Sequence, residues 1–383
     1  MSFEYWSSVY QMRAPSVKPW IFLAECRPTD DNVTKTLRRA RRADPAKGEI
    51  EVLSRFRVIV IALLLAAFMV SGASAAELNA YTIMPEKYAS QVFEAFTAAT
   101  GIKVNFMRFS SGEALARVVA EKNNPQVDVI LGGPADTYEA GIKENVFEAY
   151  KPAGADDIPA QFRSPQNFWT GIGVIPLVFL TNNTFLKDKG LAAPQSWNDL
   201  LDPAYKNGLQ MADARTSGTA TERIYTLVKV FGEDGAFDYQ KKLHQNVQMY
   251  TKSGAGGAMP IATGQAASGI FYIVDALEIQ QQGHNVVISY PKEGVTFGIE
   301  ATGVLKGAKN MESAKKFVDW AASKAFAQLI VDKKINYIPT RTDVAVTNPA
   351  LDVSKVKLFE TDVAWKGANR KAYVDRWINE VIR

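Results

Sequence analysis

The sequence predicts an α/β protein with two lobes joined by crossing strands and a ligand cleft between the lobes. From residue 78 onward, short apolar runs alternate with amphipathic helical patterns, which is typical of βαβ units. One long apolar run, residues 169–182, holds two glycines and a proline and suits a strand that crosses between lobes. The 383 residues also correspond to about two domains. Two lobes connected by more than one crossing are typical of a cleft that closes on a ligand.

The first lobe is predicted to open with short apolar strands separated by helices. The strands alternate with segments whose apolar residues recur at helical spacing, and three βαβ-type units fit before residue 150. The predicted strands are 78–82, 103–109 and 127–131, and the predicted helices are 86–100 and 112–122. The crossing strand at 169–182 follows them.

A second α/β stretch follows the crossing strand, and the chain then returns through two further strands. The predicted helices are 196–201, 219–231, 235–244, 311–323, 325–332 and 370–381, and the predicted strands are 209–212, 267–273, 285–290 and 298–305. We therefore expect residues 76–173 with about 295–345 to form lobe 1, and residues 174–294 with about 346–383 to form lobe 2.

Residues 52–75 have the composition of a Sec signal peptide. Arg55 and Arg57 precede thirteen uncharged, largely apolar residues, 58–70, and small residues follow them. As a helix this run would cover roughly 20 Å, short of the roughly 30 Å hydrocarbon core of a membrane. We expect cleavage after Ala75, with Ala76 as the alternative, so that the chain reaches the periplasm without stable membrane insertion. A retained anchor is the competing interpretation.

Residues 1–51 do not fit a leader, because a signal peptide begins within a few residues of its basic region. We interpret this Arg-rich segment as a start codon assigned too early, with initiation near Val52; the alternative is a genuine cytoplasmic extension. It contains Cys26, the one cysteine of the chain. The exported part would then have no thiol, which excludes disulfides, thiolate metal sites and cysteine nucleophiles there.

The net charge gives no reason to expect nucleic acid as a partner. The chain has 44 basic and 40 acidic side chains, but residues 1–75 hold 11 of the basic and 7 of the acidic ones, which leaves 33 of each. The exported part is therefore neutral. A neutral domain lacks the basic surface that binds nucleic acid or an anionic membrane.

Four loops repeat one chemical pattern, in which a strand ends, small hydroxyl or glycine residues follow, and a helix begins. This arrangement places free backbone N–H groups and the positive end of a helix dipole at one sheet edge, where α/β folds bind anions. A serine before a helix can also serve only as its cap. The predicted anion-binding residues are Ser110, Ser111, Gly112, Gly133, Ser217, Gly218, Thr219, Ser253 and Gly254.

Three carboxylates are predicted to contact the other end of the ligand. Asp275 follows an apolar strand at 269–274, and Glu293 and Glu300 lie in a glycine-bearing segment. Such groups contact ligand hydroxyls or an amine, although Asp275 could instead cap the next helix. The chain has no HExxH, GxSxG or Walker A motif. We expect no enzyme, and no catalytic residue, metal or cofactor.

Several motifs resemble the family 1 extracellular solute-binding proteins of ABC importers, in the branch of the ferric-iron, phosphonate and hexose-phosphate binding proteins. The resemblance is carried by residues 78–82, 110–117, 127–129, 217–220 and 250–254. It implies a type II periplasmic-binding-protein fold, a periplasmic location and an inner-membrane ABC permease as partner. We expect a monomer.

Within this branch, iron-binding members resemble the chain in topology but use a His in the first loop, a Glu after the third strand and a later Tyr pair. The chain has 83–85 Ile-Met-Pro, 132–134 Gly-Gly-Pro and 274–275 Val-Asp at those places. The usual ferric ligands are therefore missing, while residues 217–219 align with the loop that holds the iron family's anion. The organophosphate branch has a His-Asp pair, of which the chain keeps Asp275 and replaces the His by Val274.

The sequence thus predicts a periplasmic binding protein that captures a small anionic solute, with a phosphorylated sugar or a phosphonate favoured. The same-fold alternatives are ferric iron with a carried anion and a cation of the polyamine or thiamine type. A secreted phosphate-ester hydrolase is the alternative from another class, and it would need a metal cluster or an activated nucleophile.

Overall fold

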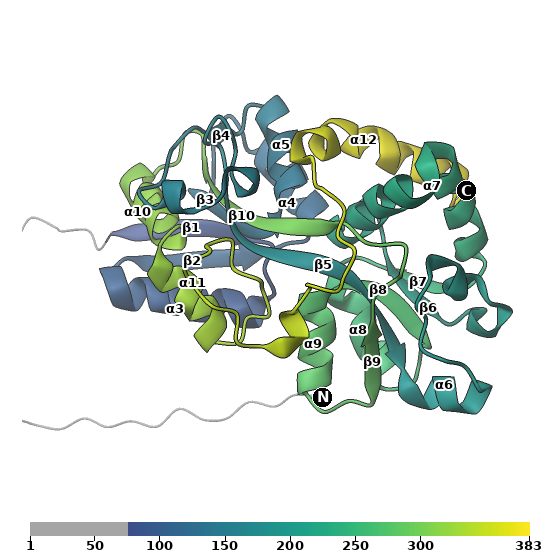
Figure 1. Cartoon of the computed structure of the whole chain (residues 1–383). Helices are drawn as coiled ribbons and strands as arrows, with labels where there is room; N and C mark the ends of the chain where they lie inside the picture. Colours follow the sequence, from purple (N-terminus) through teal and green to yellow (C-terminus); the bar gives the residue numbers. More distant parts are fainter. Residues whose placement is uncertain (1–75) are drawn as a thin grey trace, which may run out of the picture. The chain divides into compact units, whose positions relative to one another are not determined.

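The computed structural model describes residues 76–383, which form a mixed α/β structure (Figure 1). The first part of the chain alternates strands and helices as predicted. Its elements are β1 (Glu77–Thr82), α3 (Glu86–Thr100), β2 (Lys103–Arg108), α4 (Ser111–Ala120), β3 (Val129–Pro134), α5 (Ala135–Lys143) and β4 (Phe147–Glu148).

The rest of the chain begins with a strand of 13 residues and ends with a helix of 18 residues. Its elements are β5 (Thr170–Asn182), α6 (Asn183–Lys189), β6 (Leu209–Ala212), α7 (Gly218–His244), β7 (Val247–Thr251), α8 (Ala258–Ala262), β8 (Ser268–Tyr272), α9 (Ile273–Gln281), β9 (Val286–Ser289), β10 (Phe297–Leu305), α10 (Met311–Ala321), α11 (Lys324–Asp332) and α12 (Val363–Glu380).

The strands follow the order β2-β1-β3-β10-β5-β8-β6-β7, with β4 beside β10 and β9 beside β5. We call β1 to β4 and β10, with their helices, the first lobe, and β6 to β9, with theirs, the second lobe. The pairs within the outer parts of the sheet are parallel, whereas β5 and β10 run antiparallel to their neighbours. The sheet is therefore mixed, although the βαβ units that the sequence predicts favour parallel pairs.

Strand β5 crosses from one lobe to the other, as its long apolar run predicts. Its residues 170–176 pair with β10, and residues 177–182 pair with β8 and β9. Every residue of β5 is buried. Since the predicted boundary between the lobes, 173/174, falls inside this continuous strand, the division of the chain at that residue stays a prediction.

The predicted helices differ from the observed ones mainly at their ends, whereas α5, α6, α8, α9, β4 and β7 have no counterpart among the predicted ranges. Helix α7 takes the place of two predicted helices, which meet at a kink where Gly232 has φ 74° and ψ 172°. Helix α12 begins seven residues earlier than predicted, because the Asp362 side chain caps it by accepting from the backbone N–H of Trp365 at 2.9 Å. Helix α9 begins at Ile273, the last residue of the predicted strand at 267–273.

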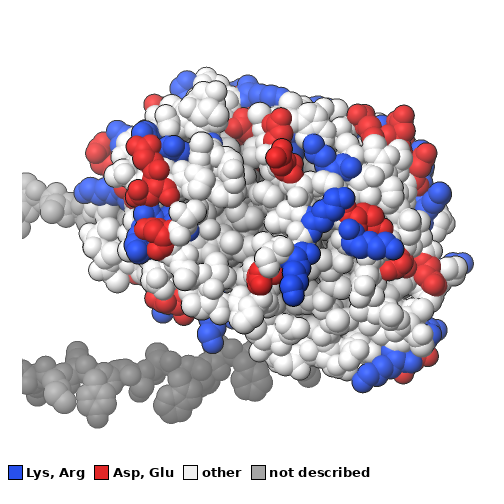
Figure 2. All heavy atoms as spheres, viewed as in Figure 1, with Lys and Arg blue, Asp and Glu red and all other residues white. Residues whose placement is uncertain are grey.

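The predicted signal peptide, 52–75, and the predicted extension, 1–51, lie outside the described residues. Within residues 76–383, no helix is both long and apolar enough to span a membrane. On the face shown in Figure 2, basic and acidic side chains are intermingled, and white surface separates the groups. That face offers no continuous basic surface of the kind that binds nucleic acid.

The core around β5 makes a direct stability prediction. Phe179 is fully buried and packs edge-on against Trp197, with ring centroids 5.1 Å apart. We expect Phe179→Ala to lower the free energy of unfolding by about 3–5 kcal/mol, because it leaves a cavity in the core. The control is Met249→Ala, at a side chain that is 57% exposed, which should change stability by less than about 0.5 kcal/mol. Urea unfolding of both variants checks this, and equal losses would contradict it.

Candidate functional site

A small cavity with a volume of about 50 Å³ lies between the two lobes, at the carboxyl ends of β1, β2, β3 and β8. Residues from both lobes line it, so a solute held there would contact both. The predicted ligand residues that line it are Ser110, Ser111, Ser217, Gly218, Thr219, Gly254, Asp275 and Glu300.

The helices α4 and α7 begin at the cavity. Ser110 is the N-cap of α4, and Ser217 is the N-cap of α7. The first turn of a helix has backbone N–H groups without partners within the helix, and the helix dipole adds a partial positive charge there. The hydroxyls of Ser111 and Thr219 lie in these first turns. Together they form an arrangement suited to an anionic group.

Arg108 also lines the cavity, and the sequence reasoning missed it. It is the last residue of β2, and its Nε–H is buried without a hydrogen-bond partner among residues 76–383. A buried guanidinium N–H without a partner is costly, so a ligand acceptor at this place would be stabilising. The available signal was a basic residue at a strand end, two positions before the predicted Ser110-Ser111-Gly112 loop.

Two carboxyl groups face the same cavity. Glu300 of β10 accepts hydrogen bonds from the backbone N–H of Gly133 at 2.7 Å and from the Tyr337 hydroxyl at 3.0 Å. Burial raises the pKa of Glu300 to about 7, against the opposing effect of these two donors. Burial also raises the pKa of Asp275 to about 7, although the positive charge of Arg108 acts in the opposite direction. Both groups can therefore exchange a proton near neutral pH.

We expected Asp275 to follow a strand directly, but it does not. Strand β8 ends at Tyr272, one or two residues before the predicted ends at Ile273 and Val274, and α9 begins at Ile273. Asp275 therefore lies in the first turn of α9, where the helix dipole stabilises a negative charge. It also lines the cavity, so the two alternatives for this residue do not exclude each other.

Two predicted glycines hold the site together and do not line the cavity. The N–H of Gly112 donates to the Thr216 carbonyl at 2.8 Å, from the first lobe to the second. A Cβ at Gly112 would come within 2.5 Å of the Arg215 carbonyl oxygen. Gly133 has φ 80° and donates to Glu300, so it positions that carboxyl group.

The other two predicted residues outside the cavity lining have structural partners. The carbonyl of Ser253 accepts from the Gly256 N–H at 3.1 Å, in the short 3₁₀ helix that follows it. Glu293 accepts from the Ser196 hydroxyl at 2.5 Å and from the Trp197 N–H at 3.3 Å. It thereby stabilises the start of the 3₁₀ helix Trp197–Leu201, and the structure does not bring it to the cavity.

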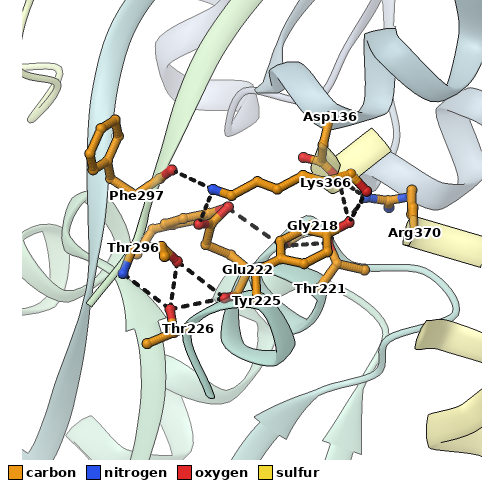
Figure 3. A network of polar contacts seen from close by, with 11 residues as sticks. Asp136, Gly218, Thr221, Glu222, Tyr225, Thr226, Thr296, Phe297, Lys366 and Arg370 are labelled. Carbon is orange, nitrogen blue, oxygen red and sulfur yellow. Dashed lines mark hydrogen bonds and ion pairs between the residues drawn. The ribbon is translucent and has the colours of Figure 1, made fainter. Parts of the chain in front are cut away.

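A buried network of charged groups adjoins the cavity (Figure 3). Arg370 of α12 donates to Asp136 of α5 at 2.5 Å, and Lys366 of α12 donates to Glu222 of α7 at 2.5 Å. The Tyr272 hydroxyl, in the cavity wall, is 3.4 Å from the Gly218 carbonyl and 3.5 Å from Glu222. The network therefore reaches the residues around the start of α7.

Comparison with known proteins decides the family. A family model described as bacterial extracellular solute-binding protein matches residues 124–364. The chain belongs to this family. Its members are substrate-binding transport proteins, and this solute-binding protein is the periplasmic binding component of an ABC transporter. Within residues 76–383 of this solute-binding protein, no group of three His, Cys, Asp or Glu side chains could hold a metal ion.

Three similar proteins illustrate the range of the family. The periplasmic binding protein AfuA from Actinobacillus pleuropneumoniae, solved with exogenous fructose-6-phosphate bound, is 34% identical with a TM-score of 0.76, over 80% of this chain and 98% of AfuA. A "Probable ABC transporter periplasmic-binding protein" of Sinorhizobium fredii is 26% identical over 90% of this chain and 96% of its own length. The Fe(3+)-binding periplasmic protein of Serratia marcescens is 26% identical over 70% of this chain and 82% of its own length. The match to AfuA confirms the type II periplasmic-binding-protein fold.

The raised pKa of Glu300 makes the stability of this solute-binding protein depend on pH. The carboxyl group titrates near 4.5 when unfolded and at about 7 when folded, so between these values the folded state binds more protons. The free energy of unfolding should therefore fall as the pH rises from 5 to 7 and then level off. Glu300→Gln should reduce this fall by roughly 2 kcal/mol, since one pKa unit corresponds to about 1.4 kcal/mol.

Urea unfolding between pH 5 and pH 8 measures this effect. Glu312→Gln is the matched control, because the side chain of Glu312 is 83% exposed and should leave the pH profile unchanged. An identical fall in the wild type and in Glu300→Gln would show that Glu300 has an ordinary pKa.

Proposed function

We propose that this protein binds a small solute that carries a phosphate or phosphonate group at one end and hydroxyl or amine groups at the other. A phosphorylated sugar is the favoured class. The protein would hold the solute between its two lobes in the periplasm and deliver it to an inner-membrane ABC permease. It is expected to act as a monomer and to require no covalent step.

The observation that carries this proposal is the Nε–H of Arg108, which has no hydrogen-bond partner in the described part of the chain and lies beside two helix N-termini. The guanidinium supplies a full positive charge, and α4 and α7 supply N–H groups and partial charges. The hydroxyls of Ser111 and Thr219 add donors from both sides. A phosphate group has enough acceptor oxygens to use all of these donors at once.

The carboxyl groups of Asp275 and Glu300 would bind the hydroxyl or amine groups at the other end of the solute. A sugar hydroxyl can donate to a carboxylate and can accept from a protonated carboxyl group, so both forms of a group with pKa near 7 can bind it. An ammonium group would instead favour the ionised form. A solute with two chemically different ends therefore matches a cavity that is lined both by hydrogen-bond donors and by carboxyl groups.

The other candidates find less support in the described residues. Ferric iron is a candidate because the Serratia marcescens relative is named as an iron-binding protein, but residues 76–383 hold no cluster of three metal-ligating side chains. A polyamine would have to approach Arg108, whose positive charge repels it. A phosphate-ester hydrolase would need a nucleophile or a metal, and we assign neither role to a residue of this cavity.

The proposal is tested by measuring ligand affinity in the wild type and in Arg108→Gln. We expect a melting-point increase with fructose 6-phosphate or 2-aminoethylphosphonate, and a calorimetric Kd that rises about 10- to 100-fold in the variant, because one charge-assisted contact is lost. The matched control is Arg163→Gln, because Arg163 pairs with Asp156 outside the cavity lining and should leave the Kd unchanged.

Free phosphate, ferric citrate and putrescine complete the set of ligands. An increase in melting point with putrescine or ferric citrate alone would contradict the assignment of an anionic solute. Equal affinity for a phosphorus compound in the wild type and in Arg108→Gln would remove the observation on which the proposal rests.

A further inference from the structure

The two lobes touch at several places, among them the exposed pair of Lys87 on α3 with Glu278 on α9. Two of these contacts have opposite character. Beside α12 the contact is buried, while at the start of α4 it is exposed and formed by one ion pair and a few hydrogen bonds. This difference indicates which contact survives when the lobes separate. The inference goes beyond the proposed function and uses it only in the choice of a probe.

The exposed contact joins the start of α4 to two loops of the second lobe. Glu113 of α4 pairs with Lys252 at 2.5 Å. The Lys252 carbonyl accepts from the Ser110 hydroxyl at 3.3 Å and from the Thr216 hydroxyl at 2.6 Å. The Gly112 N–H donates to the Thr216 carbonyl at 2.8 Å. All of the contacts between Ser110, Gly112 or Glu113 and the second lobe must break before a solute can leave by this side.

The Glu113 carboxylate is held in place by its own helix. One oxygen accepts from the backbone N–H of Ser110 at 3.3 Å, and the other faces Lys252. Partial burial raises the pKa of Glu113, but the Lys252 ammonium and the Ser110 N–H outweigh it, so the net pKa is lowered. A carboxylate already oriented in this way loses little conformational freedom when the ion pair forms, which favours the pair.

The buried contact has the opposite character. Arg370 pairs with Asp136 of the first lobe and also donates to Thr221 of the second at 3.0 Å (Figure 3). The side chains of Arg370 and Asp136 are 7% and 1% exposed. Separating a buried pair leaves two unpaired charges in a medium of low dielectric constant and costs far more than separating an exposed pair. Lobe opening should therefore keep this side together.

We propose that Glu113 and Lys252 form a latch that holds the lobes closed over the bound solute and sets the rate of its release, while the Asp136–Arg370 side acts as the pivot. Neither latch residue lines the cavity. They are positioning residues that act through Ser110, which lines the cavity and contacts both of them.

A double-mutant cycle tests the latch. Glu113→Gln keeps an acceptor for the Ser110 N–H, and Lys252→Met keeps the apolar stem, so each removes one charge. The first readout, which needs no ligand, is hydrogen exchange at the Gly112 amide, whose acceptor lies on the other lobe. The second is the release rate of fructose 6-phosphate. We expect each single variant to raise both rates about two- to five-fold, and the double variant to equal the singles.

Two controls separate the latch from a general loss of stability. Exchange at the Ile83 amide, which donates to the Leu131 carbonyl within the first lobe at 2.9 Å, should not change. Lys315→Met, at an exposed pair with Glu312, should change neither rate. In 1 M NaCl the difference between the wild type and the variants should shrink, because screening there acts over about 3 Å.

If hydrogen exchange at Gly112 is unchanged in both single variants, the latch is excluded. The latch is also excluded if the effects of the two substitutions multiply in the double variant. If Gly112 exchange responds as expected while fructose 6-phosphate does not bind, the latch stands and the proposed ligand class fails. If fructose 6-phosphate binds but its release rate is the same in all variants, the role in release is excluded.

Discussion

The arrangement of the lobes depends on four buried charged side chains that neutralise one another. Asp136 and Glu222 come from α5 and α7, and Arg370 and Lys366 both come from α12. A single member without its partner would be an uncompensated charge in a medium of low dielectric constant, so all three helices must occupy their places together. Helix α12 thereby fixes α5 of the first lobe relative to α7 of the second, and the start of α7 forms part of the cavity wall.

The division of labour between backbone and side chains follows from this arrangement. Backbone N–H groups and hydroxyls at the starts of α4 and α7 line the cavity, and Arg108 adds the full positive charge that those groups lack. Glu300 of β10 and Asp275 of α9 add carboxyl groups to the same cavity. Since β5 passes between the lobes and its residue Ile175 also lines the cavity, the site is coupled to the strand that joins the lobes.

The sequence predicted the parts of this structure that depend on local pattern. Strand β5, helix α3 and the Ser217 loop follow from hydrophobic period and capping residues, and their positions agree with the structure within a residue or two. The role of Arg108 could not be derived in the same way, because a basic residue at a strand end has no local signature of burial. The pair of Asp136 and Arg370 spans 234 positions, and no periodicity relates side chains so far apart in the chain.

Gly112 has a consequence for how variants of this protein would be recognised. A Cβ there would lie 2.5 Å from the Arg215 carbonyl oxygen, across the two lobes. Gly112 has no positive φ, so alanine fits the backbone and clashes only when the lobes meet. Such a substitution acts as a wedge: the polypeptide would fold, survive proteolysis and pass a screen for soluble expression, yet stay unable to retain its solute. Genetic surveys that score abundance alone would therefore class this position as tolerant.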